Sequence, residues 1–356
     1  EMWSYAQERE PNTITGNGED AFRAEGSHLD LRGGDDGSTQ NNRLVISGHQ
    51  NGIRASKGSK VTLRRVDVQD NSRGGIRISE NSILNVYDEG ATITGNGLIN
   101  GVCHDDSDYG LKIRDNSLAE LSYITVSNNC YGINVDSNST LEGGWEGKNS
   151  EINYGILIQG NKNMGLEVQK NSVLDVEYMK LGDPDDDGSS NGNKITGPFE
   201  RGVQVSENSY ADIKANKVTG YEREGILINR NSSARIGSDN DRDTYDSSMR
   251  SNYGNTLDGS VLPGESVEEW QTGIQVSESS TVQLHRNMIE NNSGRGIRVS
   301  ENSVLVLGGG NIIQNNKHTE SDGEVDGTGI ELSSGSFLEM WSYAQEREPN
   351  TITGNG

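Results

Sequence analysis

Residues 273–307 read GIQVSESSTVQLHRNMIENNSGRGIRVSENSVLVL, and this stretch contains the pattern that decides the fold. The phrase Gly-Ile-x-Val at Gly273 returns at Gly296. A second apolar-x-apolar phrase follows each copy, at Val282-x-Leu284 and Leu305-x-Leu307. Apolar residues therefore alternate with polar ones over short runs, which predicts strands rather than helices.

The phrase recurs along the whole chain. Its first apolar residues are Phe22, Ile53, Ile76, Leu111, Ile133, Leu166, Val203, Ile226, Ile274, Ile297 and Ile330. Two positions later stand Ala24, Ala55, Ile78, Ile113, Val135, Val168, Val205, Ile228, Val276, Val299 and Leu332, all of them apolar. Each phrase predicts one strand whose two apolar side chains face a shared core.

Turn residues separate the strand phrases. Asn-Ser or Gly-Ser pairs follow most of the Gly-Ile phrases, and Asn and Gly tolerate the positive φ that a sharp bend needs. A second apolar phrase and then a third, as at Ile93–Asn96, complete a unit that is 22–23 residues long in its shortest copies. Such a unit cannot bury its apolar side chains alone. We therefore expect about eleven coils of three short strands, stacked as one continuous all-β parallel solenoid over residues 1–356.

A much longer repeat encloses the short one. Residues 1–18 read EMWSYAQEREPNTITGNG, and residues 339–356 repeat all of these letters. An identity of this length does not arise by chance, so the offset of 338 residues between Glu1 and Glu339 predicts a tandem array. A duplication made at the boundary of the segment is the alternative. Terminal coils of solenoids normally need polar caps, and neither end shows one, so we expect a long object whose copies are joined covalently or stacked end to end.

The composition argues against several classes of protein. Lys and Arg total 31 against 54 Asp and Glu, and the formal net charge of -23 disfavours a nucleic-acid binder or a protein that lies on anionic lipid. Hydrophobic residues are 30% and aromatic residues 5% of the chain, which suits a thin core of small aliphatic side chains. No apolar run approaches the ~18 residues of a membrane span. We therefore expect no nucleic-acid partner and no membrane span.

The phrases Asn-x-Ile-x-x-Asn and Gly-Ile-x-Val-x-x-Asn-Ser-x-Leu-x-Val resemble the right-handed parallel β-helix repeat of pectate-lyase-like proteins and of large bacterial surface proteins. The resemblance covers essentially all 356 residues, and it implies a right-handed coil, in keeping with the crossover preference of parallel strands. It implies no single activity, because the family includes lyases, hydrolases, epimerases and inert stalks. With its long period, the chain is most similar to the repetitive shaft of a giant surface or fibre protein, which implies an extracellular or cell-surface location.

Three acidic insertions predict calcium sites. Alternate carboxylates on a tight loop converge on one hard cation, and Ca²⁺ takes about six to eight oxygen ligands. The candidate ligands are Asp183, Asp185 and Asp187, then Asp239, Asp241 and Asp243, and finally Asp322, Glu324 and Asp326. A helix-flanked calcium hand is excluded, because Lys194 and Ser333 stand where such loops after Asp183 and Asp322 need Glu. The alternative is that the insertions are solvated acidic turns.

The two cysteines fall in the same connection of neighbouring coils. Cys103 precedes Gly110, and Cys130 precedes Gly132. Neighbouring coils lie ~4.8 Å apart, within the Cα separation that a disulfide requires. A disulfide and two unpaired thiols both remain open, since the longer insertion at Cys103 has room to loop away.

A column of cations is predicted on the outer face of the first strand. The residue between the two core positions is Arg23, Arg54, Arg77 and Lys112 in four successive coils. On an acidic chain, this basic stripe predicts either a lateral contact with an acidic face of another copy or a groove for an anionic polysaccharide. The plainer interpretation is a solvated strand face with carboxylates beside it.

The sequence offers no clear catalytic group. Its five histidines are spread over distant coils and match neither zinc nor triad spacing. Asp105, Asp106 and Asp108 near His104 come closest to the carboxylate pair of polysaccharide-cleaving enzymes, and so acidic a chain produces such groups by number alone. We therefore expect a structural module of an extracellular filament, stalk or adhesin shaft, with calcium as its candidate cofactor, and no enzyme. A polysaccharide lyase or hydrolase, or a glycan-binding module, is the alternative.

Overall fold

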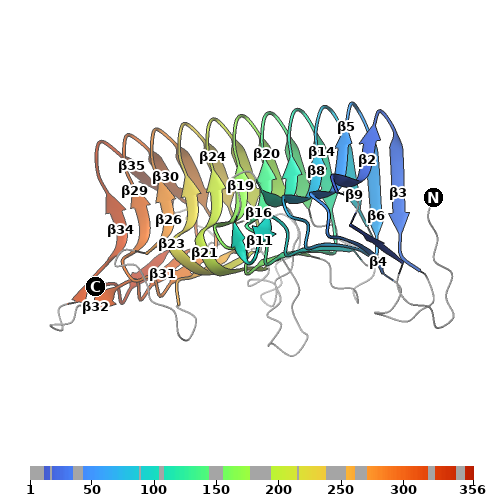
Figure 1. Cartoon of the computed structure of the whole chain (residues 1–356). Coiled ribbons are helices and arrows are strands. Elements are labelled where there is room, and N and C mark those ends of the chain that lie inside the picture. The colour runs from blue at the N-terminus through green and yellow to red at the C-terminus, as the bar shows by residue number, and fades with distance from the viewer. Residues whose placement is uncertain are drawn as a thin grey trace.

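The computed structural model describes residues 12–16, 18–34, 43–87, 90–103, 108–143, 155–176, 194–214, 216–237, 254–260, 271–319, 325–341 and 349–356. Within these ranges all regular secondary structure is β-strand. The strands stack along one axis into a single elongated solenoid (Figure 1). The first and last coils lie at opposite ends of it (Figure 1). No part of the described chain forms a helix that could cross a membrane. The predicted all-β parallel solenoid is confirmed.

Each coil contributes one strand to each of three parallel ladders. The first ladder contains β2 (Asp20–Glu25), β5 (Asn51–Ser56), β8 (Gly74–Ile78), β13 (Tyr109–Ile113), β16 (Tyr131–Val135), β19 (Met164–Val168), the ends of β21 (Lys194–Val205) and β23 (Lys217–Ile228), β26 (Thr272–Val276), β29 (Arg295–Val299) and β34 (Thr328–Leu332). The second contains β3 (His28–Arg32), β6 (Lys60–Arg64), β9 (Ile83–Val86), β14 (Leu118–Leu121), β17 (Thr140–Gly143), β20 (Val173–Val176), β22 (Tyr210–Ile213), β24 (Ser233–Ile236), β27 (Thr281–Leu284), β30 (Val304–Leu307) and β35 (Phe337–Met340).

The third ladder contains β1 (Thr13–Thr15), β4 (Leu44–Ser47), β7 (Val66–Gln69), β10 (Ala91–Thr94), β15 (Ile124–Ser127), β18 (Ile156–Gln159), the beginnings of β21 and β23, β25 (Thr256–Asp258), β28 (Met288–Glu290), β31 (Ile312–Gln314) and β36 (Thr351–Thr353). Because β21 and β23 run without a turn from the third ladder into the first, these two ladders form one 21-stranded sheet. Two short antiparallel hairpins project from the coils, β11 (Leu98–Ile99) with β12 (Val102–Cys103) and β32 (His318–Thr319) with β33 (Val325–Asp326).

The register of the first ladder confirms the predicted core columns. Ile53 pairs with Ile76, Ile76 with Leu111, and the same alignment holds through every coil from β2 to β34. Ile78, in the second of the two columns, is fully buried. Stacking identical positions thus builds a continuous apolar core from a few aliphatic side chains per coil.

Polar ladders line the corners of the coil, which the sequence patterns did not predict. After β8, Glu80 and Asn81 both adopt positive φ (56° and 62°), and this turn carries Ser82 inward. Ser82 Oγ accepts a 3.0 Å hydrogen bond from the Ser59 amide, and the Ser82 amide donates to Ser117 Oγ at 3.2 Å. The serine ladder continues through Ser139, Ser172, Ser209, Ser232, Ser280 and Ser303.

Asparagines, all buried except Asn350 and Asn355, form equivalent ladders at the other two corners. In each, a side-chain Oδ1 accepts hydrogen bonds from the amide and the Nδ2 of the asparagine one coil earlier. These ladders are Asn71–Asn96–Asn129–Asn161 and Asn292–Asn316–Asn355 after the third strand, and Asn216–Asn255–Asn287–Asn311–Asn350 before it. Buried backbone amides at the bends are thereby satisfied without water.

Candidate functional site

The four cations of the basic stripe stack in one column on the first ladder. Arg23 pairs with Arg54, Arg54 with Arg77, and Arg77 with Lys112, one residue per coil on β2, β5, β8 and β13. The residues on either side of each cation pack into the core, and all except the partly buried Phe22 are buried, so the cations occupy the outer face. Neighbouring charges are separated by the strand spacing of ~4.8 Å.

Three of these cations lack a direct ion pair within the described chain. Arg23 Nη2 lies 2.7 Å from Glu25 Oε1, and Glu25 also contacts Lys57. Arg54, Arg77 and Lys112 form no ion pair with any described carboxylate. Nε of Arg77 is buried without a hydrogen-bond partner, and Nζ of Lys112 lies 4.8 Å from the centre of the Tyr109 ring. Cations in this condition attract an anionic partner.

Burial, together with neighbouring positive charges, lowers the pKa of two of the four cations. Burial lowers the pKa of Arg77, and the charges of Arg114 and Arg54 lower it further. Burial also lowers the pKa of Lys112, where Arg114 and Arg77 add repulsion and Asp136 opposes it. Arg114, two residues beyond Lys112, keeps its own partner at 2.8 Å in Asp115. Burial is the largest cause of both shifts, and the strongest repulsion comes from Arg114, which lies outside the stripe.

Beyond Lys112 the same column continues with Asn134 and Glu167, which belong to a hydrogen-bonded cluster around one carboxylate. Glu167 Oε2 accepts a 2.7 Å hydrogen bond from the Tyr109 hydroxyl and a 2.9 Å hydrogen bond from Asn134 Nδ2. The rings of Tyr109 and Tyr131 lie 4.9 Å apart, and burial raises the pKa of the Tyr109 hydroxyl. This cluster joins three consecutive coils. The sequence patterns do not predict it, because Tyr109 lies directly before the repeated Gly-Leu-x-Ile phrase and outside its alternating positions.

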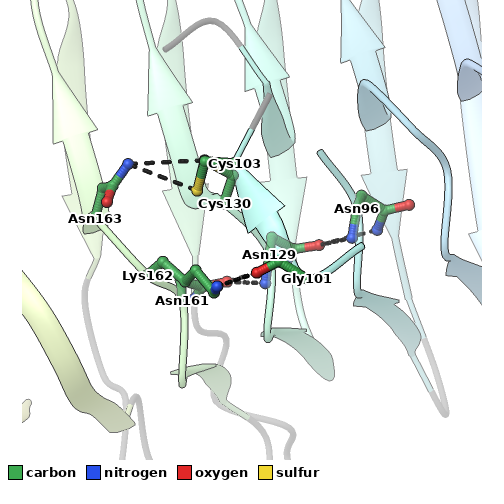
Figure 2. The surroundings of a disulfide bond; sticks show 8 residues. All are labelled: Asn96, Gly101, Cys103, Asn129, Cys130, Asn161, Lys162 and Asn163. Carbon is green, nitrogen blue, oxygen red and sulfur yellow. Dashed lines mark hydrogen bonds between the residues drawn. A yellow bond between two sulfur atoms is a disulfide. The ribbon is translucent and has the colours of Figure 1, made fainter. Parts of the chain in front are cut away.

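The two cysteines form a disulfide in the structure (Figure 2). Their Cα atoms are 5.2 Å apart, with Cys103 at the end of β12 and Cys130 in the corner before β16. Asn163 Nδ2 lies 3.7 Å from each sulfur, and Lys162 donates a hydrogen bond to the Gly101 carbonyl (Figure 2). The bond and these contacts attach the β11–β12 hairpin to the neighbouring coils.

The predicted calcium ligands lie outside the described residues. This holds for Asp183, Asp185, Asp187, Asp239, Asp241, Asp243, Asp322 and Glu324. Asp326 is described only through its backbone, which pairs with His318 in the β32–β33 hairpin. The described part of the chain contains no cluster of three or more His, Cys, Asp or Glu side chains arranged to hold a metal. Calcium binding by the acidic insertions stays a prediction.

Comparison with known proteins identifies a family for the fold. No curated protein sequence matches the chain. A family model described as a right-handed β-helix region matches residues 155–342, just over half of the chain. Proteins with this fold include enzymes as well as proteins without enzymatic activity, so the match indicates the architecture and does not indicate a reaction. The stacked parallel strands and the matched region together show that the chain belongs to the right-handed β-helix family.

Proposed function

We propose that the chain is a structural repeat module of an extracellular filament, stalk or shaft, in which successive copies continue the same solenoid end to end. The supporting observation is the phase of the long repeat. Thr13–Thr15 and Thr351–Thr353 have the same sequence, and they form β1 and β36 of the same ladder. Eleven strand pairings separate β1 from β36. One period therefore spans a whole number of coils.

A second period placed after β36 would enter the solenoid in phase. Its β2 would stack on β34, and Phe22 and Ala24 would extend the columns of Ile330 and Leu332. The outer column would place Arg23 of the next copy beside Glu331, an opposite-charge cross-strand pair. Eleven coils at the usual strand spacing give an axial period of about 53 Å.

A chain of two periods tests this proposal. Residues 1–338 are joined directly to residues 1–356, and solution X-ray scattering measures the length of the particle. We expect one stiff rod about 53 Å longer than the single chain, with a higher melting temperature because the junction is buried. A matched control lacks residues 20–25 of the second copy, which removes the strand that stacks on β34, and it should scatter as two hinged bodies. Hinged scattering from the uninterrupted chain would contradict the proposal.

An enzyme or glycan-binding module that acts on acidic polysaccharide is the second candidate. The observation that favours it is the position of Glu167, which is hydrogen-bonded by Tyr109 and Asn134 two coils from Lys112, whose pKa is lowered by burial. Acid–base groups beside cations are the chemistry that such substrates need. The test is an assay on pectin, alginate and similar polymers with calcium present. Turnover that Glu167→Gln abolishes would favour the enzyme, and absence of turnover in the parent would leave the structural module.

A further inference from the structure

The first and last strands of the third ladder have the same sequence in opposite situations. β1 and β36 both read Thr-Ile-Thr, at Thr13–Thr15 and Thr351–Thr353. Among the described strands, β1 pairs only with β4 of the following coil, and β36 pairs only with β31 of the preceding coil. Each therefore has one open edge, and an open edge is a template for another strand. The open edge of β36 is the edge that β1 uses to pair with β4.

The contacts that hold β1 on β4 depend on residues that β36 also has. Ile14 lies opposite the fully buried Ile46 and packs against the core. The Ile14 carbonyl oxygen lies 3.1 Å from Nε2 of His49, which is buried. Ile352 occupies the place of Ile14 in the last coil, and there it is 47% exposed because no coil covers it. A strand identical to β1 can form the same contacts with β4 when it comes from another copy of the chain.

We infer that separate copies of the chain join end to end by strand exchange, in which β36 of one copy replaces β1 on β4 of the next copy. The exchange conserves the strand pairing, because identical residues leave and enter. It also stacks β2 on β34 and β3 on β35, which covers the exposed core positions Leu332 and Met340 of the last coil. The inference rests on the proposed role as a structural module, and it adds how copies that are not joined covalently connect.

A glycine hinge stands where the displaced strand leaves the solenoid. Gly18 lies between β1 and β2 with a φ of 84°, a conformation that glycine adopts without strain. A Cβ placed on Gly18 would meet no other atom within 4 Å, so the backbone there is unobstructed. Rotation at Gly18 can move β1 away from β4 while β2 stays paired with β5. Each copy then has a free β36 at one end and an exchangeable β1 at the other, so the contact is heterologous and grows into a filament.

The same substitution in each of the two identical strands tests the exchange on the full chain, because the expected outcomes are opposite. Ile14→Asp weakens the chain's own β1 and leaves β36 intact, so this variant should assemble at least about tenfold faster than the parent. Ile352→Asp leaves β1 in place and puts a charge on the incoming strand, so it should assemble at least about tenfold more slowly. Docking of β36 against β1 without exchange would be weakened by both substitutions. Sedimentation velocity at successive times measures the assembly.

The double variant with Ile14→Asp and Ile352→Asp is the matched control. It should stay monomeric, because the edge of β4 is open and no intact strand can fill it. If the double variant assembles as fast as Ile14→Asp alone, the uncovered core associates non-specifically and the inference is overturned.

An Ile14→Asp chain that stays monomeric, or that assembles more slowly than the parent, also overturns the inference. Circular dichroism checks folding, and Ile14→Ala with its counterpart Ile352→Ala should show the same opposite changes at smaller size if the Asp variants unfold. The two-period chain joins its copies covalently and needs no exchange. A stiff two-period rod, together with single chains whose assembly does not differ between the variants, would therefore keep the structural module and refute the exchange alone.

Discussion

Replacing Asn129 by Ala should remove one rung of a buried amide ladder and destabilise the coils around it. Asn129 is fully buried. Its Oδ1 accepts hydrogen bonds of 2.9 Å from both the amide and the Nδ2 of Asn96. Its Nδ2 donates to the Ile93 carbonyl and to Asn161 Oδ1, both at 3.0 Å. An alanine side chain can replace none of these contacts.

The magnitude follows from the groups left without partners. The Asn96 amide loses its acceptor, which costs about 1–3 kcal/mol for a buried donor. The Nδ2 of Asn96 still donates to two backbone carbonyls, so it loses little. The two hydrogen bonds donated by Asn129 contribute about 0.5–1.5 kcal/mol each. We therefore expect a loss of about 2–6 kcal/mol. Asn163→Ala is the matched control, because the Asn163 side chain makes only 3.7 Å contacts with the two sulfurs, and it should cost less than about 1 kcal/mol.

Amide hydrogen exchange is the appropriate assay, because a solenoid can open locally without unfolding as a whole. The Asn96 amide should exchange at least about tenfold faster in Asn129→Ala than in the parent, since each 1.4 kcal/mol is about a factor of ten. In Asn163→Ala its exchange should be unchanged. If the Asn96 amide stays as protected in Asn129→Ala as in the parent, the ladder adds no stability and the reasoning is wrong.

Three further predictions concern the core, the corners and the acidic loops. Ile78→Asp places a charge at a fully buried position of the first ladder and should cost at least several kcal/mol in a melting experiment; a parent-like melting temperature would contradict the inside–outside assignment. Gly132→Ala would put a Cβ 2.2 Å from the Gly165 carbonyl oxygen of the next coil, so it should melt below the parent by more than an exposed Gly→Ala change does, and equal melting would contradict close coil packing there. EDTA should lower the melting temperature and added calcium should restore it, with magnesium a poor substitute. Asp185→Asn combined with Asp187→Asn should remove that response, and a parent indifferent to EDTA would make the loop a plain acidic turn.

The core columns could be predicted from the sequence because their signal is local. A strand phrase such as Ile76-x-Ile78 places two apolar residues on one face through the period of two, and the glycine before it marks where each copy starts. The number of strand phrases then predicts the number of stacked coils. The register between β8 and β13 follows even though the intervening segment is long, because both phrases align on the same glycine.

The polar ladders were not predictable from residue types, because Asn and Ser are also the commonest turn formers. The sequence predicts a bend at Asn81-Ser82, and these residue types fit both a solvent-exposed turn and a turn whose serine joins a buried ladder. Only the backbone shows that Glu80 shares the positive φ of Asn81, which turns the serine into the core and leaves the asparagine outside. Whether a turn residue faces inward is a property of two consecutive dihedral angles, and side-chain chemistry does not specify it.

The basic stripe could be predicted from the sequence, but the contacts between different strand positions could not. The basic stripe needs one strand position followed from coil to coil, whereas the Tyr109–Glu167 hydrogen bond joins different positions two coils apart. The column of Glu120, Glu142, Asp175 and Asp212 in the second ladder was missed for another reason. Its members occupy the middle of the second strands, and a segment longer than a shortest coil separates Glu142 from Asp175, so their alignment becomes evident only from the paired strands.

The solenoid also explains why the cations of the basic stripe are evenly spaced. The buried ladders hold successive coils at one strand spacing. Where β21 and β23 pass a corner without a turn, the Tyr221 hydroxyl donates a 2.5 Å hydrogen bond to Asn292 Oδ1. With the rise per coil held constant, any outer position that repeats a charge becomes a straight line of charges at ~4.8 Å. The equal spacing is therefore a consequence of the fold. What the fold does not impose is the sign of the charges along the column, which changes from Arg23, Arg54, Arg77 and Lys112 to Glu167 two coils further on.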